Sequence, residues 1–224
     1  MRLVVITPEA LTPGEPAVAR AMLQRGLDTL HLRKPAASRE QLVAYLAELG
    51  EPWTRRVMLH SHHDVACEVR VKGLHFREAD VPRTAPPMPP PPMPGLAQST
   101  SFHQLARASE PWGPALTYAF LSPVFDSISK PGYSAAGFEA AAVRRTASAP
   151  GAAPLIALGG VTPGNLAAAA DMGFAGAAVL GAVWHQADPA AAVEALLRVC
   201  ERLGAGAEAG GGDAVDAAGA RPAG

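Results

Sequence analysis

Short apolar runs alternate with amphipathic segments along most of the chain. The pattern predicts eight short strands, at residues 2–6, 28–33, 56–60, 71–76, 95–100, 116–121, 155–158 and 175–180. Helical spacing of apolar residues follows most of them, at residues 16–26, 42–49, 63–69, 102–108, 137–146, 163–172 and from 189 onward. Regular alternation of strands and helices predicts one (β/α)8 TIM barrel, and an open doubly wound sheet is the alternative.

Two segments depart from this pattern. Residues 86–94 contain seven prolines and two methionines. Because proline removes a backbone donor and clashes with the preceding turn, we expect a stiff loop where the helix after strand four would stand. After Gly204 the chain is rich in alanine and glycine and has little apolar surface to bury. We therefore predict a barrel over residues 1–203 and a disordered tail over 204–224.

Alternation within the second strand assigns faces to its side chains. His31 and Arg33 share one face, and Leu30 and Leu32 share the other. A capping box at Ser38, with Gln41 three residues later, predicts the start of the next helix.

The strongest candidate site residues follow strands six to eight. Ser127, Ser129 and Lys130 offer hydroxyls and an ammonium within one loop, which suits a phosphate ester. Gly159 and Gly160 follow strand seven, before a helix that we expect to begin with Thr162 as N-cap and Pro163 at its first position. Leu180 and Gly181 follow strand eight, and the loops after strands seven and eight are the usual phosphate position of such barrels. The alternative for the glycine pair is a tight turn without a ligand.

Composition excludes several classes of protein. The 224 residues are 49% hydrophobic and 5% aromatic, and their formal net charge is −1. This balance argues against nucleic-acid and membrane partners. Without a signal peptide or membrane span, a cytoplasmic protein is expected, with Cys67 and Cys200 as buried free thiols.

Five motifs in order resemble the thiamine phosphate synthase superfamily, which includes the thiazole tautomerase (TenI) branch. The segment from Ser122 to Lys130 resembles the family's Gly-Pro-x-Phe-x-Thr-x-Thr-Lys loop. The others are Ile156–Val161 with Asn165, Gly73–Phe76 through Asp80, Ser101-Phe-His103 and Ala178–Gly181. The resemblance implies an enzyme of thiamine biosynthesis that binds a thiazole phosphate.

The resemblance implies different roles in the two branches. In a tautomerase, His103 is the proton shuttle, with Arg33 and Lys130 beside it, and no cofactor is needed. In a synthase, which joins a pyrimidine diphosphate to the thiazole phosphate, Asp80 binds Mg²⁺. The family's Asn-Asp pair after strand three is His60-Ser61 here, and its Arg-x-Lys is Arg33-Lys34-Pro35, so Lys34 would have to compensate.

Thiazole tautomerase is therefore the first functional hypothesis, thiamine phosphate synthase the alternative, and a non-catalytic thiazole phosphate-binding protein a third. Ser101 and His60 are further candidate substrate contacts, together with Ser127, Ser129, Gly159, Gly160, Leu180 and Gly181. The sequence leaves open whether the chain acts as a monomer or a homodimer.

Several of these residues have simpler explanations. His103 could pad a helix start, Arg33 could pair with Asp80, and His31 and His75 could be interior residues satisfied by backbone groups. His60, His62 and His63 with Asp64 also suggest a metal-dependent hydrolase, as a less favoured interpretation.

Overall fold

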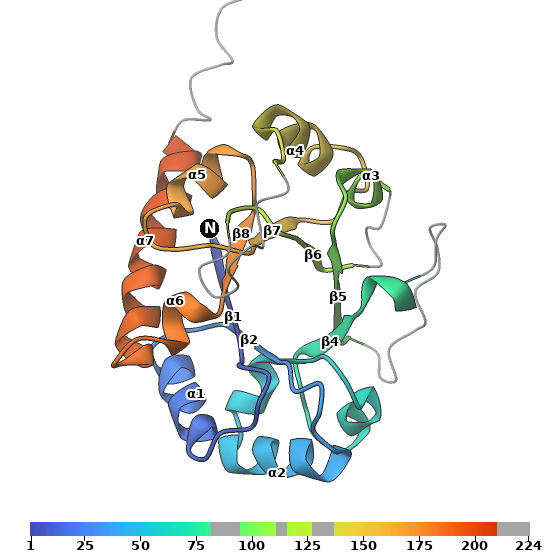
Figure 1. Ribbon diagram of the computed structural model, residues 1–224, viewed down its shortest axis with the longest axis vertical. Coiled ribbons are helices and arrows are strands. Elements are labelled where there is room, and N and C mark those ends of the chain that lie inside the picture. Colours follow the sequence, from blue (N-terminus) through green and yellow to red (C-terminus); the bar gives the residue numbers. More distant parts are fainter. Residues whose placement is uncertain (82–94, 111–115, 127–136, 210–224) are drawn as a thin grey trace, which may run out of the picture.

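Eight parallel strands close into a barrel, in the order β1 to β8 around its circumference (Figure 1). The computed structural model describes residues 1–81, 95–110, 116–126 and 137–209. The strands are β1 (Arg2–Ile6), β2 (Thr29–Leu32), β3 (Val57–Leu59), β4 (Gly73–Phe76), β5 (Ala97–Phe102), β6 (Tyr118–Leu121), β7 (Leu155–Leu158) and β8 (Gly176–Val179). The prediction of a single TIM barrel is confirmed.

Helices form an outer ring around the strands (Figure 1). The α-helices are α1 (Glu15–Gln24), α2 (Arg39–Leu49), α3 (Leu105–Ala108), α4 (Ala140–Ala147), α5 (Leu166–Asp171), α6 (Gly181–Trp184) and α7 (Pro189–Ala209). Three 3₁₀ helices complete the described elements: η1 (Trp53–Arg56), η2 (His63–Cys67) and η3 (Glu78–Asp80). None of the helices described is long and apolar enough to cross a bilayer.

The register of β2 confirms the predicted faces. Leu30 pairs with Val5 and Val57, and all three belong to the core between the barrel and its helices. His31 pairs with Ile6 and Met58, which belong to the separate cluster inside the barrel. The alternation of β2 therefore places an imidazole in the barrel interior.

The predicted capping box of α2 is present. The Gln41 backbone N–H donates to Ser38 Oγ at 3.3 Å, and the Ser38 N–H donates to Gln41 Oε1 at 2.8 Å. These reciprocal bonds satisfy two donors that the first helical turn would otherwise leave unpaired.

Four local expectations need correction. The helix expected at 63–69 is the shorter 3₁₀ helix η2, and its Cys67 is exposed rather than buried. The helix expected from Pro163 begins at Leu166, because Asn165 folds residues 160–165 into a turn: its Oδ1 accepts from the Thr162 N–H and its Nδ2 donates to the Gly160 carbonyl. The last helix continues past Gly204 to Ala209. The proline run at 86–94 and the remaining tail lie outside the described residues.

Candidate active site

A cavity of about 610 Å³ opens where the strands end at the carboxyl side of the barrel. We call it the mouth pocket. It is lined by Ile6, Pro8, Glu9, Arg33, His60, His75, Arg77, Glu78, Ser101, His103, Phe120, Ser122, Leu158 and Leu180. Polar and charged side chains from several strand ends meet there, which is the usual arrangement of an active site in this fold.

Five of the predicted site residues line the mouth pocket: Arg33, His60, Ser101, His103 and Leu180. Gly159 and Gly181 directly follow the lining residues Leu158 and Leu180. Ser127, Ser129 and Lys130 lie outside the described residues, so their roles remain predictions.

Gly159 and Gly160 have a structural reason to be glycine. Both have positive φ angles, 92° and 63°. A Cβ on Gly160 would lie 2.2 Å from the Asp126 carbonyl oxygen, and a Cβ on Gly159 would lie 3.0 Å from Pro123. The turn after β7 therefore packs directly against the start of the loop that leads to Ser127.

His103 follows β5 at the rim of the pocket. Its Nδ1 lies 3.0 Å from the Ser122 carbonyl oxygen, which can only accept, so Nδ1 is the donor. This bond orients the ring and leaves Nε2 as the atom for proton exchange with a ligand.

Arg33 lies on the same rim but does not pair with Asp80, contrary to the alternative raised above. Its guanidinium donates to Glu9 Oε1 at 2.6 Å. Asp80 instead receives two bonds from Arg77, at 2.7 and 2.9 Å, and this ion pair holds the pKa of Asp80 below its usual range.

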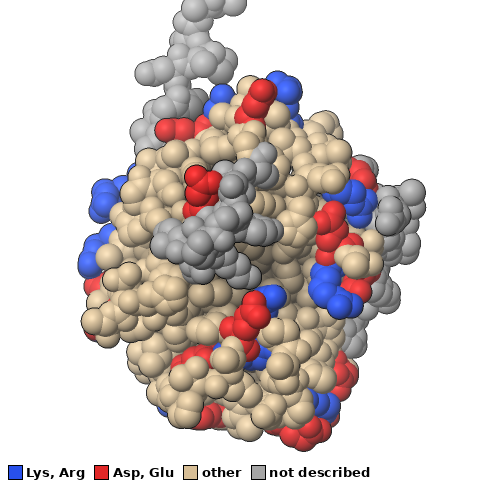
Figure 2. All heavy atoms as spheres, viewed as in Figure 1, with Lys and Arg blue, Asp and Glu red and all other residues tan. Residues whose placement is uncertain are grey.

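Sequence reasoning missed Glu9, Arg77 and Glu78 as pocket residues. Arg77 directly follows the last residue of β4, so the rule that strand ends carry the site could have identified it. Acidic and basic side chains lie close together on this face, without a large area of one sign (Figure 2).

Lys34 is not available to a ligand, which corrects the expectation that it could replace the family's displaced lysine. Its side chain is fully buried, and Nζ donates to Glu15 Oε2 at 2.6 Å and to the Pro8 and Ala10 carbonyls at 2.7 Å each. Tyr45 donates to the other oxygen of Glu15 at 3.1 Å. With three acceptors around it, the ammonium holds the β1–α1 loop, and Lys34 does not line the mouth pocket.

A chain of side-chain hydrogen bonds crosses the pocket floor. His31 Nδ1 lies 2.8 Å from His60 Nε2, and His31 Nε2 lies 2.5 Å from the Tyr118 hydroxyl. His75 bonds Ser99 Oγ at 2.9 Å and Ser101 Oγ at 3.2 Å. These partners are side chains, so the expected backbone partners of His31 and His75 were wrong.

Burial controls the protonation of this cluster. Desolvation lowers the pKa of His31 and His60 well below the usual value for histidine, and it lowers the pKa of His75 to about 3. Coulombic repulsion between neighbouring imidazoles adds to the shift. All three rings are therefore neutral at physiological pH.

The histidines suggested for a metal-dependent hydrolase do not converge. His62 Nε2 donates to the Ala37 carbonyl at 3.1 Å, and His63 Nε2 donates to the His75 carbonyl at 3.2 Å. Asp64 pairs with Arg39 at 2.7 Å. The prediction of a metal cluster from His60, His62, His63 and Asp64 is therefore wrong. His60 instead lies close to His31 and His75.

The donor set does not fit a magnesium site of the family's kind. Mg²⁺ prefers oxygen ligands and near-octahedral geometry. His60 and Ser61 stand where the family has its Asn-Asp pair, and the Asp80 carboxylate is held by Arg77. Neither position presents a carboxylate to the mouth pocket.

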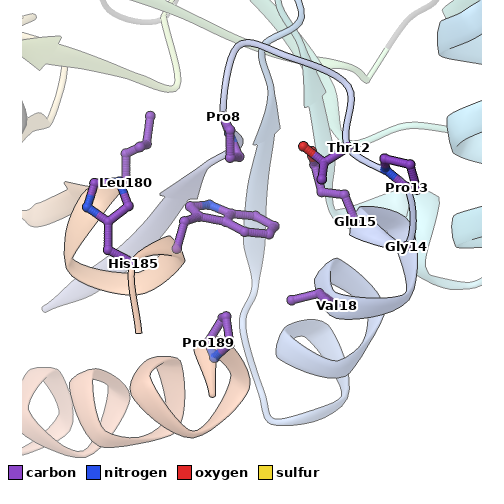
Figure 3. Close-up of a pocket in the computed structure, with 10 residues that line it drawn as sticks. Pro8, Thr12, Pro13, Gly14, Glu15, Val18, Leu180, His185 and Pro189 are labelled. Atoms are coloured by element: carbon purple, nitrogen blue, oxygen red, sulfur yellow. The ribbon is translucent and has the colours of Figure 1, made fainter. Parts of the chain in front are cut away.

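A second cavity of about 520 Å³ lies beside the mouth pocket, between the β1–α1 loop and α6. In Figure 3, Thr12, Pro13 and Val18 lie on one side of it, and Leu180 and His185 lie on the other. Its lining is mainly apolar, and Pro8 and Leu180 also line the mouth pocket. This second cavity lacks the converging polar groups of the mouth pocket. The mouth pocket is therefore the candidate active site.

Fold and site together define the protein as a (β/α)8-barrel enzyme with a pocket lined by imidazoles, arginines and glutamates at the carboxyl ends of its strands. The sequence matches the family model described as thiamine monophosphate synthase over residues 3–183. The chain belongs to this family, which confirms the resemblance and the prediction of an enzyme.

Individual relatives agree with this assignment. The chain is 32% identical to a thiamine-phosphate synthase of Chlorobium luteolum, over 91% of this chain and 95% of that one. It is 30% identical to the bifunctional protein ThiED of Geobacter sulfurreducens, over 88% of this chain but only 42% of that longer one. A thiamine phosphate pyrophosphorylase structure from Bacteroides thetaiotaomicron superposes with a TM-score of 0.71 at 25% identity, covering 90% of this chain and 98% of the other.

Proposed function

We propose that this chain forms thiamine phosphate by joining a hydroxymethylpyrimidine diphosphate to a thiazole phosphate, with release of diphosphate. The relatives that carry the name thiamine-phosphate synthase favour this reaction over tautomerisation. The observation that carries it is the mouth pocket, where two arginines and three imidazoles meet in one cavity of about 610 Å³.

Arg33 and Arg77 would neutralise the leaving diphosphate, because guanidinium groups form strong charge-assisted bonds with phosphate oxygens. Both are rim residues whose present partners, Glu9 and Asp80, are exposed carboxylates that a diphosphate could displace. Lys130 would add a third cation. The thiazole phosphate would lie near Gly159, Gly160, Leu180 and Gly181, with Ser127 and Ser129 as donors.

Tautomerase-type proton transfer is the second candidate, and two observations favour it. His103 is oriented by Ser122 with Nε2 left for proton exchange. The lysine and carboxylate that a magnesium diphosphate would need are buried or absent, as Lys34 and Ser61 show. A proton shuttle needs neither of these groups.

One assay separates the two reactions. The purified chain would be given both precursors with Mg²⁺, and separately the thiazole carboxylate tautomer alone in the presence of a chelator. Formation of thiamine phosphate supports the synthase, whereas isomerisation in chelator supports the tautomerase.

The variant His103→Asn adds a second criterion. A general acid or base contributes about 10²–10⁴-fold, so its loss should abolish isomerisation while leaving coupling within about tenfold. His62→Gln, outside the mouth pocket, is the matched control. Tight binding of thiazole phosphate with neither reaction would instead indicate a non-catalytic binding protein.

A further inference from the structure

Three imidazoles from neighbouring strands converge on the floor of the mouth pocket. His31 lies in β2, His60 directly follows β3, and His75 lies in β4. One nitrogen from each lies within 4.8 Å of the other two. His60 and His75 stack with ring centroids 4.1 Å apart, and both line the pocket.

The contact between His31 and His60 restricts what can lie between them. Their facing nitrogens are 2.8 Å apart, so two lone pairs would repel each other. The space between them holds either one N–H proton or a cation. Two imidazoles bound to one zinc ion, at about 2.0–2.1 Å each, have nitrogens roughly 3–4 Å apart. Adding His75 would need a movement on the order of 1 Å.

Second partners support the outer nitrogens of two of these rings. Tyr118 bonds His31 Nε2, which leaves His31 Nδ1 facing the centre of the cluster. Ser99 Oγ lies 2.9 Å from His75 Nδ1, and Ser101 Oγ lies 3.2 Å from His75 Nε2. The longer contact is the weaker one, so a metal ion would replace Ser101 as the partner of Nε2. Hydrogen bonds of this kind fix the tautomer and orientation of metal-binding histidines.

We propose that His31, His60 and His75 bind one divalent transition-metal ion, of the borderline-soft class to which Zn²⁺ and Co²⁺ belong. Imidazole suits these ions, whereas Mg²⁺ prefers oxygen. Three protein ligands leave a position open, as in catalytic rather than structural zinc sites, and here that position faces the mouth pocket. The site is distinct from the one expected at Asp80, and it does not depend on which reaction the chain catalyses.

Metal titration of the full chain tests the proposal. After treatment with a chelator and its removal, the protein would be titrated with Zn²⁺ by calorimetry and with Co²⁺ by visible spectroscopy. One ion per chain is expected, with a d–d spectrum typical of nitrogen ligation for Co²⁺. Mg²⁺ at the same concentrations should neither bind nor displace Co²⁺.

Variants assign the ligands. His60→Gln is the first choice, because His60 is only partly buried and its replacement should leave the barrel folded, as circular dichroism would verify. Affinity should fall at least 10-fold, and the double variant His60→Gln/His75→Asn should remove the stoichiometric site. The control His62→Gln, two residues away and bonded to the Ala37 carbonyl, should bind like the parent chain.

The proposal is overturned if the parent chain binds neither Zn²⁺ nor Co²⁺ at one ion per chain. It is equally overturned if the folded double variant retains the site, or if His62→Gln weakens binding as much as His60→Gln does.

Discussion

Among the described residues, different groups shape the two halves of the barrel mouth. Along β1 to β4 the mouth is made of side chains: buried imidazoles, an arginine paired with Glu9, and below them the buried pair of Lys34 and Glu15. Along β6 to β8 the described residues include a tight backbone turn at Gly159 and Gly160, which packs on residues 123–126. In the first half, His60-Ser61 and Arg33-Lys34-Pro35 depart from the family's residues, whereas the segments that follow β6, β7 and β8 resemble its pattern.

This contrast shows where the chemistry of the site can change without a change of fold. A backbone turn that needs two positive φ angles tolerates few substitutions. Side chains on strand ends can be exchanged while the barrel register stays the same. We therefore expect specificity for metal and diphosphate to be set by the β1–β4 half, and phosphate anchoring by the other.

Acidification should produce the largest effect, mainly through the histidines of the β1–β4 half. Because the folded pKa values of His31, His60 and His75 lie below the unfolded value near 6.5, their contribution to stability is present above that pH. This contribution is lost as the pH falls below about 6.5, because these histidines then bind protons in the unfolded chain but not in the folded chain. In chelator, the free energy of unfolding should fall by about 2 kcal/mol per histidine between pH 7 and 5, or about 4–6 kcal/mol together.

Urea unfolding at a series of pH values measures this slope. His60→Gln should make the slope shallower by at most about a third, because His63, whose pKa desolvation also lowers, titrates alongside the three clustered histidines. A parent chain equally stable at pH 7 and 5 would contradict the buried, neutral state of the cluster.

The buried ion pair should give the next largest effect. Lys34→Met leaves the Glu15 carboxylate buried without its cation, which should cost about 3–5 kcal/mol in urea unfolding at pH 7. Arg55→Met, which removes an exposed pair with Glu51, should cost less than about 1 kcal/mol. If Lys34→Met instead weakened diphosphate binding at unchanged stability, the lysine would belong to the mouth after all.

These two effects also mark the limit of sequence reasoning. Strand alternation predicted the barrel and the inward face of His31, because a two-residue period is a local property. It could not predict that Lys34 turns inward, because that depends on Glu15, Pro8 and Ala10, which approach it only in the folded β1–α1 loop.

The histidine cluster escaped prediction for a similar reason. His60, His62 and His63 are close in sequence, yet it is His31 and His75, from the two flanking strands, that meet His60. Adjacency in a closed barrel is set by strand order and register, not by distance along the chain. Conversely, the glycine pair was identified from the sequence: its turn is tight, and its role in phosphate binding stays a prediction.

A substitution in the turn along the β6–β8 half should lower stability by a smaller but still measurable amount. Gly160→Ala forces a Cβ to within 2.2 Å of the Asp126 carbonyl at a φ of 63°, so the loop must move. We expect a loss of at least about 2 kcal/mol in the free energy of unfolding, together with weaker binding of inorganic phosphate. Gly164→Ala is the matched control, since its nearest neighbour would be Thr162 Oγ1 at 3.7 Å. If Gly160→Ala and Gly164→Ala lowered stability and phosphate binding equally, the turn after β7 would not be the feature that distinguishes this half of the mouth.

The smallest expected effect concerns the charge on the rim of the β1–β4 half. Glu9 and a ligand compete for Arg33, so Glu9→Gln should free the guanidinium and tighten binding of inorganic diphosphate by about 2–5-fold. Stability should change by less than about 0.5 kcal/mol, because the ion pair is exposed. Calorimetric titration with diphosphate measures the change, and Glu51→Gln, which alters an exposed pair outside the mouth, controls for net charge. Weaker binding in Glu9→Gln would mean that Glu9 positions Arg33 rather than competing for it, and the diphosphate would then depend on an intact carboxylate–arginine pair.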